Sequence, residues 1–403
     1  MKMILEGIRV LDWTVYQAGP FAAALLADLG ADVIHLEEPG RGDLLRGVKT
    51  SFGVSPVLPQ GRNIHVEEHN RNKRGLALNL KHPKSKEVVA RLIAETDIFM
   101  TNYRLQAAKR FGMDYETLSQ HNPRLIYAHS SGFGVKGPDA DSPSLDFVAQ
   151  ARAGSLLALT PPDAEPTLGI PNVGDRSCSI FTAFGVLAAL IGRDRLGIGQ
   201  EVFASQLGSM ICLQGYTISL ALLSGKDVPS HVRTEAPNPM WNSYKCKDGQ
   251  WIALGGFATV NWPPFCKAIN IPELQADERF KSMEMRQENR KELIAIIDDI
   301  MATKTRDEWL EIFRNNDVVA SRVNRLVDLA SDPQVLANDY ITEWDHPTLG
   351  PMKFVGFPVE YSKTPLKFRM AAPEVGQHTE EILLEVCGYD WDDINKLRDE
   401  GVI

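Results

Sequence analysis

Short segments rich in β-branched residues alternate with helical stretches through the first half of this 403-residue chain. Alternation of this kind predicts a parallel sheet covered by helices. We therefore expect an α/β fold whose large, doubly wound domain is of the nucleotide-binding type. The expected strands lie at 8–11, 32–36, 97–100 and 125–128, and the expected helices between them at 21–29 and 83–95.

The second half of the chain has a different organisation. Two apolar helical stretches between 180 and 223 flank the turn RDRLGIGQ, and a charged linker follows. A strand at 251–254 and helices at 286–301 and 306–314, the last capped by Thr305, indicate a separate α+β unit. Extended segments around 352–359 then lead to short closing helices that return to the first domain. The expected division is 1–224 for the large domain, 225–240 for a linker, 241–327 for a small central domain and 328–403 for the linker and return.

The charge balance argues against nucleic acid as a partner. The chain has 43 Lys and Arg against 52 Asp and Glu, a formal net charge of −9, so any anion must be held by a local pocket. Five cysteines are scattered without CxxC spacing, which indicates reduced thiols. The opening segment has no secretory pattern and no run of about 18 apolar residues follows. We expect a cytoplasmic protein without a membrane span.

Two short segments match binding motifs but are better explained as loops. Residues 132–137 fit GxGxxG after a strand, but Pro138 follows instead of the helix that would hold a pyrophosphate, so a glycine-rich loop is expected. Residues 65–69 fit H-x-x-E-H, yet their flanks make no sustained amphipathic helix. A solvated loop and no metal site are expected there.

An aspartate precedes the apolar helical run at 177–191. Asp175 has two interpretations, an ordinary helix N-cap or a carboxylate nucleophile kept ionised by the helix dipole and desolvated by apolar neighbours. Spacing alone leaves both open. In the first β/α turn, Tyr16 and Gln17 precede a helix in which Pro20 is expected at the first position, and the free N–H groups there suit a phosphate or carboxylate.

Cations and aromatic rings gather next to the expected strand ends. Such a set suits a nucleotide with several phosphates, because cations pair with phosphate and a ring stacks on the base. The residues are Arg71, Lys73, Arg74, Lys81, Tyr103, Arg104, Arg110 and Phe111.

Ordered segments along most of the chain resemble the family III CoA-transferases, the group of the formyl-CoA, carnitine and bile-acid CoA-transferases. The segments are LEGIRVLDWTVYQAGPFAAALLADLGADVIHLEEPGRGDLLRG, NRNKRGLALNL, DIFMTNYR, KRFGMDYETLSQHNPRLIYAHSSGFG, VGDRSCSIFTAFGVLAAL, GIGQEV and DGQWIALGG. The resemblance implies a large domain built from both chain ends, a small central domain and a dimer of two interlocked rings.

The resemblance also implies covalent catalysis on an aspartate. Asp175 occupies the position of the family nucleophile, and it would form an acyl-aspartyl anhydride and then an aspartyl-CoA thioester. Gln17 matches a glutamine near the reacting groups, and Asp146 matches an acidic active-site position, although a helix-start aspartate is an alternative. Gly255 and Gly256 match part of a glycine loop thought to shield intermediates. The positions implied to contact CoA are Tyr16, Leu78, Lys81, Asn102, Tyr103, Arg110 and Phe111.

Some positions depart from the family. Glu38 lies where some members place an arginine on the CoA phosphates, so Lys73 or Arg74 is expected to serve instead. Leu145 stands where the related α-methylacyl-CoA racemases have a histidine, so the second acid/base group of a two-base racemase is missing. Racemase is therefore only the second hypothesis. Trp241, with Tyr244 and Trp262, is a candidate for an acyl pocket or for the core.

The expected function is CoA transfer from an acyl-CoA donor, with succinyl-CoA a candidate, to an aromatic, branched or dicarboxylic acid acceptor. No cofactor is expected beyond CoA as substrate. A homodimer is expected, and a heteromer with a paralogous subunit is an alternative. The third hypothesis is that this chain is itself the non-catalytic subunit of a heteromeric CoA-transferase.

Overall fold

The computed structural model describes residues 2–256 and 259–403 and divides the chain into two compact units. The larger unit comprises Met1–Ala158, Pro166–Val228 and Glu343–Ile403, and the smaller comprises Leu159–Glu165 and Pro229–Thr342. The smaller unit is wider at both ends than the expected 241–327. The chain end belongs to the larger unit from Glu343 onward.

The larger unit is built on a six-stranded parallel sheet with the order β3-β2-β1-β4-β5-β6. This order confirms the expected α/β class, and the direction of strand addition reverses between β1 and β4, where α/β proteins hold their ligands. The strands are β1 Arg9–Trp13, β2 Asp32–Glu37, β3 Lys73–Ala77, β4 Ile98–Thr101, β5 Ile126–Ser131 and β6 Gln200–Ser205.

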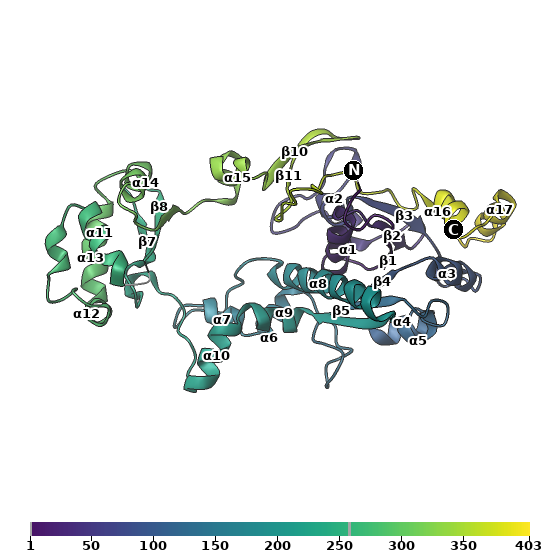
Figure 1. Cartoon of the computed structure of the whole chain (residues 1–403), viewed down its shortest axis with the longest axis horizontal. Helices are drawn as coiled ribbons and strands as arrows, with labels where there is room; N and C mark the ends of the chain where they lie inside the picture. The colour runs from purple at the N-terminus through teal and green to yellow at the C-terminus, as the bar shows by residue number, and fades with distance from the viewer. Residues whose placement is uncertain (1, 257–258) are drawn as a thin grey trace. The chain divides into compact units, whose positions relative to one another are not determined.

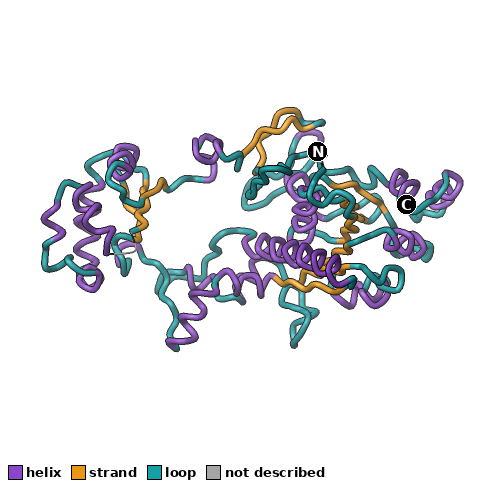
Figure 2. The backbone as a smooth tube through the Cα atoms, in the orientation of Figure 1, coloured by secondary structure: helices purple, strands orange, loops and turns teal. Residues whose placement is uncertain are grey.

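Helices cover both faces of this sheet, as the purple and orange segments of the larger unit show in Figure 2. Those of the larger unit are α1 Ala18–Asp28, α2 Ile64–Asn70, α3 Ser85–Ala94, α4 Leu105–Phe111, α5 Tyr115–Leu118, α6 Asp146–Arg152, α8 Val173–Leu196, α9 Gln206–Leu213, α10 Gly215–Ser224, α16 Thr379–Glu385 and α17 Trp391–Asp399, while α7 Ser155–Leu159 ends at the unit boundary.

Each face of the sheet has its own core because successive strand residues point to opposite sides. Val10 faces α1 and α8, which run side by side (Figure 1) and bury Leu26, Val186 and Leu190. Leu11 faces the other way, into a second core. Both faces of the sheet are therefore dry, which explains why its inner strands are nearly continuous apolar runs.

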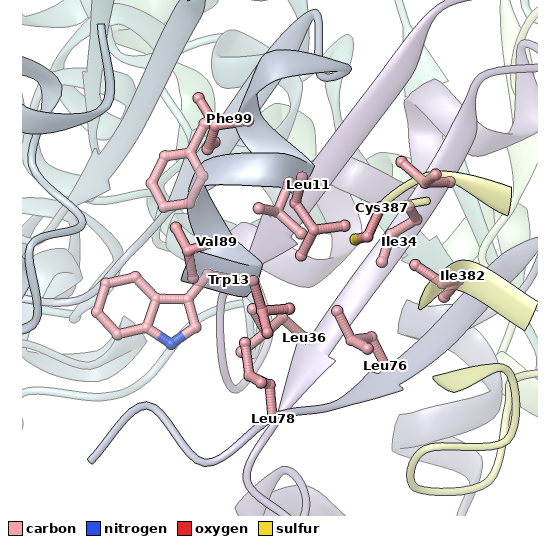
Figure 3. Packing of buried hydrophobic residues seen from close by; sticks show 14 of the residues in the cluster. Leu11, Trp13, Ile34, Leu36, Leu76, Leu78, Val89, Phe99, Ile382 and Cys387 are labelled. Carbon is pink, nitrogen blue, oxygen red and sulfur yellow. The ribbon is translucent and has the colours of Figure 1, made fainter. Parts of the chain in front are cut away.

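The second core joins the two ends of the chain. Figure 3 shows Leu11, Ile34 and Leu76 of three adjacent strands packed beside Ile382 of α16 and Cys387. The same region closes the edge of β3: the Gly75 N–H donates to Nδ1 of His378 at 3.0 Å. A free strand edge invites pairing with other chains, so this cover also protects the sheet.

Strand β6 is absent from the sequence-based expectation, which had only helices and a turn between 180 and 223. The strand lies at the sheet edge and most of its residues are exposed or half-buried, so it lacks the apolar run that marks the inner strands. The helix before it is α8, and α9 and α10 follow it.

By length and composition alone, α8 and the bent pair α9 and α10 would also suffice to cross a membrane. Half of the apolar window of α8 is buried within the protein. A helix that packs on a sheet has the same composition, and the core described above accounts for the buried apolar residues of α8, whereas Ile180, Phe184 and Ile191 of this helix are exposed.

The smaller unit carries a three-stranded antiparallel sheet with the order β7-β8-β9 and helices over a separate core. Helix α14 begins after Thr305 as expected, with a capping box between Thr305 and Glu308. The elements are β7 Trp241–Lys245, β8 Trp251–Gly255, α11 Trp262–Ala268, α12 Met283–Glu288, α13 Arg290–Met301, α14 Arg306–Arg314, β9 Ala320–Arg322 and α15 Pro333–Ala337. The strand β10 Ile341–His346 begins at the unit boundary, and its partner β11 Gly350–Val355 belongs to the larger unit.

Candidate active site

A cavity of about 640 Å³ lies in the larger unit at the carboxyl ends of the parallel strands. Lys81 lines it after β3, Tyr103 lines it after β4 and Gln206 lines it after β6. Since β3 and β6 form opposite edges of the sheet, the lining extends over a distance on the order of 20 Å across it. The cavity thus suits an extended ligand.

Asp175 lines this cavity from the first turn of α8. The helix begins at Val173, with Asn172 as its N-cap, so Asp175 is the third helical residue and not the cap. The N-cap explanation of Asp175 is therefore wrong, because α8 begins at Val173, two residues before Asp175. The Asp175 carboxylate faces the cavity and does not cap its own helix.

The capping task belongs to Asp146, the first residue of α6. Its Oδ2 accepts from the backbone N–H of Asn172 at 2.9 Å, and its Oδ1 accepts from Gly174 at 2.7 Å and from Asp175 at 3.1 Å. These are the free N–H groups at the start of α8. Asp146 therefore anchors one helix to another, and it does not line the cavity.

Gln206, which sequence reasoning missed, is the direct partner of Asp175. Its Nε2 donates to Oδ1 of Asp175 at 2.5 Å, while its Oε1 accepts from the Ser144 hydroxyl at 2.9 Å. All three side chains line the cavity. Gln206 directly follows β6, so recognising that strand would have pointed to it.

The surroundings of Asp175 make its carboxyl a weak acid. Burial raises its pKa to about 6, and the negative charge of Asp146 adds to the rise. The hydrogen bond from Gln206 and the positive charge of Arg176 act in the opposite direction. At neutral pH the carboxylate is ionised yet poorly solvated, which is a favourable state for a nucleophile.

Gln17 lies on the same side as the start of α8 without lining the cavity. It is the N-cap residue of α1, and its Nε2 donates to Oδ1 of Asn172 at 3.4 Å. The helix starts at Ala18, so Pro20 is its third residue and not the expected first one. Gln17 thus touches the residue that caps α8 and not Asp175 itself.

Most positions expected to contact CoA line the cavity. Asn102 does so with its amide engaged by Val15: the Val15 N–H donates to Oδ1 at 2.9 Å, and Nδ2 donates to the Val15 carbonyl at 2.7 Å. It shapes the first β/α turn. Tyr103 stacks on Trp13 with ring centroids 4.2 Å apart. The expected residues in the lining are Tyr16, Leu78, Lys81, Asn102, Tyr103 and Phe111.

Arg110 is the expected CoA contact that the lining leaves out. Its guanidinium lies 5.4 Å from the ring centroid of Phe111, which does line the cavity. Arg41 and Arg104 are lining cations, and within residues 2–256 and 259–403 neither guanidinium forms an ion pair. Glu38 accepts a hydrogen bond from Lys81 at 2.7 Å, and this contact lowers the pKa of Glu38.

Lys73 and Arg74 cannot replace the missing arginine, contrary to expectation. Lys73 is fully buried and its Nζ lies 2.8 Å from Oδ2 of Asp12. Arg74 pairs with Asp32 at 2.7 Å. Each is held by a carboxylate, and as neighbours on β3 the two side chains point to opposite faces of the sheet, which charge patterning does not reveal.

The residues expected to shield intermediates lie in the smaller unit. Trp241 and Gly255 pair across β7 and β8, and the Gly256 N–H donates to the Met240 carbonyl at 2.8 Å. Phe257 and Ala258 of this loop lie outside the described residues. Trp241 is 57% exposed, whereas Tyr244 and Trp262 are buried core residues, so the acyl-pocket hypothesis is wrong for those two.

The two short motifs have structural roles. Residues 65–69 form helix α2 and not the expected loop, because the Asn63 side chain caps it and Glu67 is buried against His346 at 3.0 Å. No group of three metal-ligating side chains occurs among the residues the structure describes. Residues 132–137 form a loop after β5, and the next helix, α6, begins only at Asp146.

Comparisons with known proteins identify the family of this chain. The chain matches the model of CoA-transferase family III over residues 5–379. Succinyl-CoA:glutarate CoA-transferase of Mus musculus is 33% identical over 399 residues, 99% of this chain and 90% of the mouse protein. (R)-2-hydroxy-4-methylpentanoate CoA-transferase of Clostridioides difficile is 33% identical over 404 residues, 100% of each chain.

A solved structure shares the fold of this chain. A CAIB/BAIF family protein from Brucella suis superimposes with a TM-score of 0.83 and 28% identity, covering 96% of this chain and 100% of that one. The chain therefore belongs to CoA-transferase family III, and the expectation of an enzyme of this family is confirmed.

Proposed function

We propose that the protein moves CoA from an acyl-CoA donor to a carboxylic acid through covalent intermediates on Asp175. The supporting observation is a desolvated carboxylate in the wall of the cavity at the sheet's switch point, with one oxygen held by Gln206. A carboxylate acceptor is a poor nucleophile, so two easier covalent steps replace one difficult exchange.

In the first half of the reaction, an Asp175 oxygen attacks the donor thioester carbon. A C–O bond forms, the C–S bond breaks, and CoA leaves as thiolate. The thiolate then attacks Cγ of Asp175, forming an aspartyl-CoA thioester and releasing the donor acid as carboxylate.

In the second half, the acceptor carboxylate attacks Cγ, and CoA leaves again as thiolate. The thiolate attacks the acyl carbon of the new anhydride, which gives the product acyl-CoA and restores the Asp175 carboxylate. CoA is thus substrate and carrier, and the proposal needs no other cofactor.

Cations and aromatic rings at the cavity would hold the CoA nucleotide. Arg41, Lys81 and Arg104 are the candidates for its phosphates, with Phe111 as a stacking surface. Because Lys81 is shared with the carboxylate of Glu38, the two arginines would carry more of this task than Lys81.

Succinyl-CoA is our proposed donor, and an aromatic, branched or dicarboxylic acid our proposed acceptor. The mouse relative's name contains succinyl-CoA and a dicarboxylic acid, and the bacterial relative's name contains a branched hydroxy acid. Gly255 and Gly256 would help to exclude water from the anhydride.

A cytoplasmic homodimer of interlocked chains completes the proposal, and size analysis of the protein expressed alone tests its assembly. An exclusively monomeric species would contradict the homodimer and favour a heteromer.

Intact-protein mass spectrometry tests the mechanism. Protein incubated with a panel of acyl-CoAs should gain a hydroxylamine-sensitive adduct that maps to Asp175, and Asp175→Ala should gain none. Asp194→Ala is the matched control, since Asp194 is an exposed aspartate on the same helix. Exchange of an α-proton in deuterated water without any adduct would instead support the racemase, and neither signal would support a non-catalytic subunit.

A further inference from the structure

We infer that Gln206 is a catalytic residue whose amide stabilises the oxyanion formed at Oδ1 of Asp175. The inference rests on the proposed aspartyl mechanism and assigns a role that the family resemblance did not suggest. Nε2 of Gln206 donates to Oδ1 in the resting protein, so the amide is already aimed at the atom on which the negative charge would develop.

The amide of Gln206 has one possible orientation while Asp175 is ionised. A carboxylate only accepts hydrogen bonds, so the NH₂ group must face Oδ1. The opposite side of the amide then presents Oε1 to the Ser144 hydroxyl, which donates to it at 2.9 Å. Ser144 therefore holds the amide in the orientation that donates to Asp175.

Burial makes this contact strong. Gln206 is 6% exposed and begins α9, whose N-cap Ser205 accepts from the Gly208 N–H. Such an amide is fixed before the reaction and needs little reorganisation as charge develops. An unpaired polar group at this depth would be costly, so the contact with Asp175 is well maintained.

The two oxygens of Asp175 differ in a way that defines their tasks. Oδ1 accepts from Gln206, whereas no donor among the residues the structure describes bonds Oδ2. Oδ2 is therefore the oxygen that attacks the donor. Once Oδ2 is acylated, Oδ1 becomes the carbonyl oxygen of the anhydride and later of the thioester.

Negative charge builds on Oδ1 when a nucleophile attacks Cγ. This happens when CoA thiolate opens the first anhydride and when the acceptor acid opens the thioester. In the initial attack by Oδ2, the charge instead builds on the donor's own carbonyl oxygen. Gln206 should therefore matter more for breakdown of the first adduct than for its formation.

A neutral amide suits this task better than a cation. A lysine or arginine at this distance would stabilise the resting carboxylate and reduce its nucleophilicity. An amide stabilises the oxyanion with less effect on the resting charge. Because Gln206 keeps the same partner atom throughout, one donor serves both attacks on Cγ.

The test compares Gln206→Met with Gln120→Met, a matched change at an exposed glutamine on the surface of the same unit. Rapid-mixing mass spectrometry with an accepted acyl-CoA separates the two adducts by mass. Formation is that of the acyl-aspartyl anhydride, and decay is its conversion to aspartyl-CoA or the loss of aspartyl-CoA after addition of acceptor acid. In Gln206→Met, decay should slow by about 10²–10³-fold, the usual loss for one oxyanion donor, and formation by less than about tenfold. Gln120→Met should match the wild type.

A second variant separates the role from a folding defect. Ser144→Ala keeps the amide but removes the group that orients it, so decay should slow by a smaller factor. In the wild type, the hydrogen bond from Gln206 lowers the pKa of Asp175. The apparent pKa of adduct formation should therefore rise in Gln206→Met, which lacks this bond.

The outcomes distinguish the two proposals. Wild-type decay rates in Gln206→Met, or formation slowed as much as decay, would overturn the oxyanion role and leave the aspartyl mechanism standing. If Gln206→Met fails to fold, decay in Ser144→Ala decides, and an unchanged rate overturns the role. Absence of any adduct in the wild type would overturn the proposed function and this role with it.

Discussion

The backbone N–H of Asp175 donates a hydrogen bond to the carboxylate of Asp146 at 3.1 Å, so the two acidic residues are joined by a helix cap. The same proximity makes their charges repel, which contributes to the raised pKa of Asp175. One side chain therefore both fixes the candidate nucleophile in space and sets its acidity.

Asp146→Asn should separate these two effects. Removal of the negative charge should lower the apparent pKa of adduct formation below that of the wild type. The weakened cap should lower the free energy of unfolding by about 2 kcal/mol, the scale for hydrogen bonds to a charged group. The pH profile and denaturant unfolding measure the two changes, and Asp194→Asn, at an exposed aspartate of α8, is the control.

Adduct formation in the wild type should rise with pH through an apparent pKa of about 6, since only the ionised carboxylate attacks. Single-turnover mass spectrometry between pH 4.5 and 8 measures this profile. A profile that is flat across this interval would contradict a pKa of about 6 for the attacking carboxyl of Asp175.

The raised pKa of Asp175 also predicts a stability effect. The folded protein binds a proton on this group more tightly than the unfolded chain does, so stability falls as pH rises from the ordinary value of 3.8 to about 6. Asp175→Asn removes the buried charge. The variant should unfold at higher denaturant concentration than the wild type above pH 6, and the difference should shrink toward pH 4.

Substitution by methionine should lower the stability of the protein at Lys73 and impair acyl-CoA binding at Lys81. Lys73→Met takes the ammonium group away from the fully buried Asp12, which keeps the contact with His35, and should lower the free energy of unfolding by about 3–5 kcal/mol. Lys81→Met removes an exposed cavity cation and should leave stability unchanged while raising the KM for acyl-CoA. Thermal unfolding and steady-state kinetics on both variants check this pair.

Much of the fold could be predicted because the inner strands are recognisable as short apolar runs in the sequence. Segments such as 32–36 and 97–100 are buried on both faces, and their apolar runs are visible in the sequence. The edge strand β6 is exposed on both sides and leaves no such run. Helix α2 was missed for a related reason, since its seven residues are held by the tertiary partners of Glu67.

The candidate site was predictable only in part. The importance of Asp175 came from family resemblance, because an aspartate before a helix is usually a cap. What the sequence could not reveal is that Asp146, 29 positions earlier, takes over the capping. Gln206 was missed because its contact with Asp175 joins two elements across 31 positions.

The closing helices of the chain have a consequence for its synthesis. Ile382 and Leu397 complete the core that Leu11 begins, and His378 closes the edge of β3. These residues leave the ribosome long after the strands that need them. The nascent sheet must therefore wait with part of one apolar face and one strand edge uncovered, the interval in which a chaperone is most useful to this protein.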